Sequence, residues 1–125
     1  MLYAFREESE LPEETALKIA CGLGAGMGRK AEVCGAVTGG ILVLGMRHGR
    51  GSKDDRSAMV FTYSKTRELM DEFTKKHGTY ICHKLLNGCE LTTEEGQKYF
   101  KENDLLKKIC TPCVRSVAEI LENIT

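Results

Sequence analysis

The six cysteines of this 125-residue chain are the residues most able to do chemistry. They are Cys21, Cys34, Cys82, Cys89, Cys110 and Cys113. Cys110-Thr-Pro-Cys113 is a C-x-x-C pair, which is typical of a dithiol couple or of half a metal site. In a reducing compartment, so many cysteines favour redox or metal chemistry over structural disulfides. The residues predict a chemistry, but they do not identify a substrate.

Three of these cysteines fall where the sequence predicts the start of a helix: Cys34, Cys110 and Cys113. Cys82 lies at or near the start of a shorter predicted helix. The positive end of a helix dipole favours thiolate, the form that attacks disulfides and binds metals. Iron–sulfur ligation by scattered cysteines and a helical thiol-redox centre both remain open.

Other chemistries have less support in the sequence. A thioredoxin-like site requires a strand–helix unit around the C-x-x-C pair, and a zinc finger requires two paired knuckles. His83 follows Cys82 directly, and neighbours on a helix face different ways, so we expect a surface histidine. Cys21 is expected on the buried face of its helix, because free cysteine packs as a small apolar residue.

A glycine-rich loop over residues 22–31 precedes the apolar segment that begins near Cys34. Glycines recur in it at every second position, and Gly35 follows Cys34. Such a loop allows close packing, or it offers bare N–H groups to an anion, with Arg29 and Lys30 beside it. The candidate ligand-binding glycines are Gly24, Gly26, Gly28 and Gly35. No strand precedes the loop, so a dinucleotide fingerprint is excluded.

The spacing of apolar residues and the residues typical of helix ends predict which helices contain these residues. Pro12 followed by two acids predicts a helix start, with Leu17 among its apolar residues. Residues 32–46 are apolar on all sides and rich in glycine, which predicts a buried central helix. A long helix to about Lys76 carries a stripe expected in the core or at a dimer interface. The stripe comprises Met59, Val60, Tyr63, Thr66, Leu69, Met70 and Phe73.

Three further helices are predicted toward the C-terminus. A short helix carries Cys82 and ends at Asn87-Gly88. Thr92 to Glu95 has the form of a capping box for a helix to about Asn103, with Tyr99 and Phe100 directed inward. The last helix runs from Thr111-Pro112 to about Asn123. Its expected apolar face contains Val114, Val117, Leu121 and Ile124.

Composition sets the class of the protein. The length predicts a single domain over residues 1–125, all-α, with five or six helices bundled around the buried glycine-rich helix. The 18 basic and 18 acidic residues give no basic field, so nucleic-acid binding is not expected. The N-terminus lacks signal-peptide features, and the apolar run Val33–Met46 is too short to span a bilayer. We expect a cytoplasmic protein without membrane insertion.

The sequence resembles the redox-active C_GCAxxG_C_C family in GLGAGMGRKAEVCGAVTGGILVLG, in YICHKLLNG and in the IC before the terminal helix. The family hallmark corresponds to Cys34-Gly35-Ala36-Val37-Thr38-Gly39, with Cys82 and Cys110 in the downstream positions. The resemblance covers roughly Leu11 to Thr125. It implies a small helical protein of unassigned activity. One departure is that family members usually carry another cysteine ahead of the glycine-rich loop, where this chain begins at Met1.

Together, these features predict a redox protein in which Cys34, Cys82 and Cys110 converge beside the loop as catalytic thiols. As metal ligands, the same three would be joined by Cys113, the best substitute for the missing family cysteine. The cofactor is either absent or an iron–sulfur cluster or other thiolate-bound metal. The expected partner is a redox partner of unknown identity, and a homodimer is an open alternative. A different hypothesis is a non-catalytic binding module that holds an anionic small molecule or a partner at the glycine-rich loop.

Overall fold

The computed structural model describes residues 1–124, and this part of the chain is all-α, as predicted from the sequence. The longer helices are α1 (Glu13–Ala20), α3 (Gly35–His48), α4 (Arg56–His77), α6 (Glu94–Glu102) and α7 (Thr111–Asn123). Two helices, α2 (Gly24–Met27) and α5 (Cys82–Leu85), are single turns. Two 3₁₀ turns and one π-helical turn complete the fold: η1 (Arg6–Ser9), η2 (Cys21–Leu23) and η3 (Leu106–Cys110).

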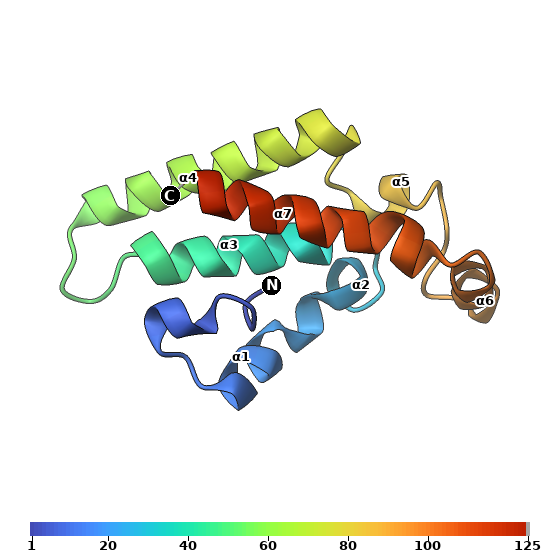
Figure 1. Cartoon of the computed structure of the whole chain (residues 1–125), viewed down its shortest axis with the longest axis horizontal. Coiled ribbons are helices and arrows are strands. Elements are labelled where there is room, and N and C mark those ends of the chain that lie inside the picture. Colours follow the sequence, from blue (N-terminus) through green and yellow to red (C-terminus); the bar gives the residue numbers. More distant parts are fainter. Residues whose placement is uncertain (125) are drawn as a thin grey trace.

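Three helices, α3, α4 and α7, lie side by side and enclose the main core (Figure 1). Leu44, Leu69, Phe73 and Leu121 are fully buried between them. Gly40 allows α3 to approach both neighbours, because a Cβ there would lie 2.8 Å from Val117 Cγ1 and 2.9 Å from Leu69 Cδ2. The N-terminal turns and α1 lie along one side of this layer, while α5 and α6 lie at one end (Figure 1).

Local signals explain most helix boundaries. The Asp55 side chain caps α4 by accepting a hydrogen bond from the Ser57 amide at 2.7 Å, and left-handed Gly78 ends the helix. The cap of α6 is Thr93 rather than the predicted Thr92, since Thr93 Oγ1 accepts from the Gly96 amide. The prediction was off by one residue because Thr92 and Thr93 are adjacent and each has a hydroxyl that could cap the helix.

The N-terminal arm is held to the bundle by Arg47 on α3. Its guanidinium donates to both carboxylate oxygens of Glu8, at 2.7 and 2.8 Å, and to the Leu121 carbonyl at 2.8 Å. Bidentate charge-assisted hydrogen bonds of this kind are the stronger ones in proteins. Arg47 therefore joins the arm, α3 and α7 at one point.

Several predictions about buried faces were wrong. Cys21 is exposed and Leu17 is 48% exposed, because α1 buries only Ala16 against the bundle. Tyr99 is 55% exposed, because α6 covers the end of the molecule and no element covers its outer side (Figure 1). The apolar face predicted for α7 is also narrower than expected, since Val114 is exposed. On α4, Leu69 and Phe73 are buried in the core, whereas Val60 and Tyr63 are exposed, so for this part of the stripe the dimer interface stays a prediction.

The glycine-rich loop contains a left-handed turn from Ala25 to Arg29, in which every residue has a positive φ. At Gly26, a Cβ would lie 2.5 Å from Ala31 Cα, so the backbones are in direct contact. Left-handed backbone costs roughly 1–2 kcal/mol for each non-glycine residue, and strain of this kind clusters at functional sites. The turn places Arg29 next to the segment that leads to Cys34.

Within residues 1–124, none of the helices has the length and apolar character needed to cross a lipid bilayer.

Candidate functional site

Backbone hydrogen bonds join the segment before Cys34 to the segment before Cys82. The Cys34 amide donates to the Tyr80 carbonyl at 2.8 Å, and the Cys82 amide donates to the Glu32 carbonyl at 2.6 Å. An isolated antiparallel bridge pairs Val33 with Ile81 between them. Two cysteines 48 positions apart in the sequence are thereby held at neighbouring helix starts, α3 and α5.

The Cys34 sulfur lies at the N-terminus of α3, where Cys34 is the N-cap. A hydrogen bond from the Cys113 thiol is the largest cause that lowers the pKa of Cys34. The amides of Ala36 and Val37 also donate to this sulfur, and together the three outweigh desolvation and bring the pKa to about 6. Cys34 is therefore mostly thiolate at neutral pH.

The other three nearby thiols are held in the neutral form. Cys113 is 1% exposed, and its hydrogen bond to Cys34, together with burial, raises its pKa strongly. Burial raises the pKa of Cys82 to about 11, with a smaller contribution from the charge of Cys34. Burial and the same charge also raise the pKa of Cys110. One thiolate therefore lies among three thiols that are kept protonated by burial together with the charge of Cys34.

The C-x-x-C pair does not begin a new helix, which corrects the sequence prediction. The backbone is already helical at Leu105, and the π turn η3 continues into α7 through Cys110 and Thr111. Both the amide and the hydroxyl of Thr111 donate to the Leu106 carbonyl. Pro112 has no N–H to donate to the ladder, and a single π turn inside a continuous helix is a feature often found at functional sites. The terminal dipole therefore favours thiolate at Cys34, but not at Cys110 or Cys113.

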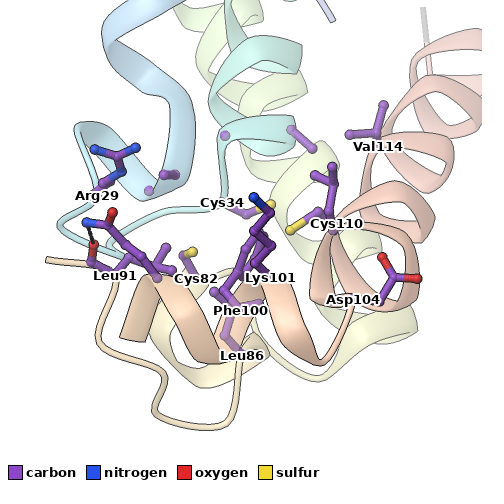
Figure 2. Close-up of a pocket in the computed structure, with 16 residues that line it drawn as sticks. Arg29, Cys34, Cys82, Leu86, Leu91, Phe100, Lys101, Asp104, Cys110 and Val114 are labelled. Carbon is purple, nitrogen blue, oxygen red and sulfur yellow. Dashed lines mark hydrogen bonds between the residues drawn. The ribbon is translucent and has the colours of Figure 1, made fainter. Parts of the chain in front are cut away.

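Cys34, Cys82 and Cys110 line one cavity of about 660 Å³ at the junction of α2, α3, α5, α6 and η3 (Figure 2). Its walls are mainly apolar and include Leu86, Leu91, Phe100, Leu106 and Val114. Arg29, Lys101 and Asp104 also line it, and all three are exposed. The sulfurs of Cys34 and Cys110 lie between the side chains of α6 and those of α7 in Figure 2.

The structure thus brings together the three cysteines predicted as catalytic, with Cys113 behind Cys34 and outside the cavity lining. Of the candidate ligand-binding glycines, Gly26 and Gly35 line the cavity, whereas Gly24 and Gly28 do not. Cys89 does not line the cavity, but it is buried in a second core cluster that also contains Cys82, and its thiol donates to the Gly96 carbonyl at 3.2 Å. Lys101 on α6 and Asp104 in the turn after it also line the cavity but were not predicted, because in the sequence they look like any other solvated charges.

The predicted metal ligands do not form a metal-binding group as they are placed. Among residues 1–124, no three His, Cys, Asp or Glu side chains are arranged so that they could hold a metal ion. The arrangement that the structure does contain is a thiolate in contact with a thiol, which is the arrangement of a dithiol before oxidation.

Comparison with known proteins gives one match. The model of a family described as "Putative redox-active protein (C_GCAxxG_C_C)" matches residues 1–124, nearly the whole chain. Neither the search of curated proteins nor the search of solved structures finds a match.

Proposed function

Because the chain belongs to the C_GCAxxG_C_C family of redox-active proteins, we propose that it is a thiol–disulfide redox protein in which Cys34 attacks and Cys113 completes the disulfide. The observation that supports this most directly is that Cys34, at the N-terminus of α3, packs against the buried cluster that contains Cys113, whose thiol lowers the Cys34 pKa. A low-pKa thiolate with a second thiol within reach is the requirement for such a couple.

The proposed reaction is an exchange with a disulfide substrate. The Cys34 thiolate forms a bond to one substrate sulfur, and the other sulfur leaves as a thiolate and takes a proton from solvent. The Cys113 sulfur then gives up its proton and attacks Cys34, which releases the first substrate sulfur as the second thiol. The protein dithiol is oxidised to a disulfide, the substrate disulfide is reduced to two thiols, and an external dithiol returns the protein to its starting state.

The change in charge during the first step explains how Cys113 can act second. Its raised pKa comes first from its hydrogen bond to the Cys34 thiolate, and then from burial and the charge of Cys34. The mixed disulfide removes the charge of Cys34, so two of these causes disappear. Cys113 is therefore protected as a thiol until Cys34 has reacted.

Cys110 is the best alternative second thiol, because it lines the same cavity and senses the charge of Cys34. Cys82 approaches from α5 and has the less reactive thiol, with a pKa of about 11. Both would also be ligands in the thiolate–metal alternative, since their charges, like that of Cys34, raise the pKa of Cys113 and they therefore lie near it.

The test is to purify the protein anaerobically, measure its metal content, and oxidise the reduced chain with a stoichiometric disulfide. Peptide mapping by mass spectrometry should find a bond between Cys34 and Cys113 and two thiols released per protein. The Cys21→Ser variant, which changes an exposed cysteine outside the cavity, is the matched control. Stoichiometric bound metal, or an oxidised protein in which Cys34 stays free, would rule out the dithiol mechanism.

A further inference from the structure

The shape and charge of the cavity restrict the substrate of the proposed redox reaction. Its volume of about 660 Å³ lies within the usual range of small-molecule sites, roughly 300–1,000 Å³. The reactive Cys34 and the neutral Cys82 and Cys110 line its wall together with leucine, phenylalanine and valine side chains. A molecule that reaches Cys34 must therefore pass along an apolar surface.

The apolar lining extends outward as far as the opening. Leu106 and Val114 line the cavity, yet they are 60% and 46% exposed. Phe100 on α6 and Leu86 after α5 are more buried and belong to, or pack against, the second core cluster. The cavity thus offers a continuous apolar path from solvent to sulfur, which suits an aliphatic chain better than a peptide with its many polar groups.

Positive side chains outnumber negative ones in the cavity lining: Arg29 and Lys101 are cations, and Asp104 is the anion. Arg29 lies on the α2 side, Asp104 on the side of the connection to α7, and Lys101 between them (Figure 2). Neither cation forms an ion pair with a carboxylate of residues 1–124. Two cations at the end of an apolar path complement a chain that carries a terminal anion.

We infer that the substrate of this site is a small amphiphilic disulfide, with an apolar chain along the cavity wall and a carboxylate at Arg29 and Lys101. This inference rests on the proposed thiol–disulfide function. Attack by Cys34 opens the substrate disulfide, and closure of the Cys34–Cys113 bond releases it as a dithiol. Two electrons pass from the protein thiols to the substrate sulfurs, and the substrate gains two protons, one from Cys113 and one from solvent.

Binding is tested without redox chemistry by using octanoate, an aliphatic carboxylate that has no disulfide. Calorimetry on the reduced protein should detect binding, and Arg29→Ala and Lys101→Ala should each weaken it about three- to fivefold, the worth of an exposed ion pair. Lys30→Ala and Lys98→Ala are matched controls, because these lysines lie next to the same elements without lining the cavity. Loss of binding in the controls, or no binding at all, overturns the assignment.

Reaction is tested with lipoate, a cyclic disulfide on an aliphatic chain that ends in a carboxylate. Stopped-flow measurement should find that lipoate oxidises the protein faster than lipoamide, cystamine or oxidised glutathione does, and that Arg29→Ala reduces the preference for lipoate over lipoamide. If all four disulfides react equally fast, the substrate class is wrong and the redox function stands. If none oxidises the Cys34–Cys113 pair although octanoate binds, the redox function and the disulfide substrate are both overturned.

Discussion

Cys113 on α7 lies in the main core against which Cys34, at the start of α3, packs, and its thiol is the largest cause of the lowered Cys34 pKa. Cys113 is almost fully buried, whereas Cys34 also faces the cavity. The pair therefore has one sulfur available to a substrate and one sealed behind it. This asymmetry gives each cysteine a different expected behaviour.

Alkylation of Cys34 should follow a titration with a midpoint near pH 6, because the thiolate alone reacts and its pKa is about 6. Cys113→Ala removes the largest cause of that low pKa and should move the midpoint upward, toward the ordinary value of 9. The measurement is the rate of iodoacetamide labelling at Cys34, read by mass spectrometry from pH 5 to 9. An unchanged midpoint in Cys113→Ala would contradict the role of the thiol contact.

The reduced protein should become more stable as the pH rises from 6 toward 9. The pKa of Cys34 is lower in the folded chain than its ordinary value of 9, so the unfolded chain binds more protons across this interval. Above pH 9 the trend should reverse, because the pKa of Cys82 is raised to about 11 and that of Cys113 is also raised. Urea unfolding in the presence of a phosphine reductant measures both the rise in stability below pH 9 and the fall above it. A Cys34→Ser variant that kept the rise between pH 6 and 9 would assign it to another group.

Gly40→Ala should destabilise the protein by about 1–3 kcal/mol, because the added methyl group overlaps Val117 and Leu69 in a close-packed core. Gly45→Ala is the matched control on the same helix, since nothing lies within 4 Å of a Cβ at that position. The control should stabilise α3 by about 0.5–1 kcal/mol. Thermal unfolding of the two variants compares them directly, and a stable Gly40→Ala protein would show that α3 and α7 can separate without cost.

Arg47→Ala should lower the free energy of unfolding by about 2 kcal/mol, because it removes charge-assisted hydrogen bonds to Glu8 and Leu121 from a side chain that is 12% exposed. The N-terminal arm should lose protection in hydrogen exchange, while residues 80–83 near the site should keep theirs. Arg50→Ala, which removes one exposed hydrogen bond to Asp54, is the control and should change stability by less than about 0.5 kcal/mol. An equal loss of unfolding free energy in both variants would argue against a special role for the Arg47 hydrogen bonds.

The sequence alone determined the class of the fold and most of its boundaries. Pro12 and Asn87-Gly88 mark helix ends that the structure contains, because capping and proline geometry act over a few residues. The cysteines and the glycine-rich loop also indicated the region of the site, since thiol chemistry requires particular residue types. The sequence did not determine which faces are buried. Cys21 and Tyr99 lie on faces that stay exposed when the described residues 1–124 pack together.

Only the tertiary structure decided how the cysteines differ. Cys34 and Cys113 are 79 positions apart, and their contact depends on the packing of α3 against α7 around Gly40. Arg29 and Lys101 meet at one cavity although no sequence pattern connects them. Residue types and local backbone preferences are written in the sequence, whereas pKa values and cavities arise from contacts between distant segments.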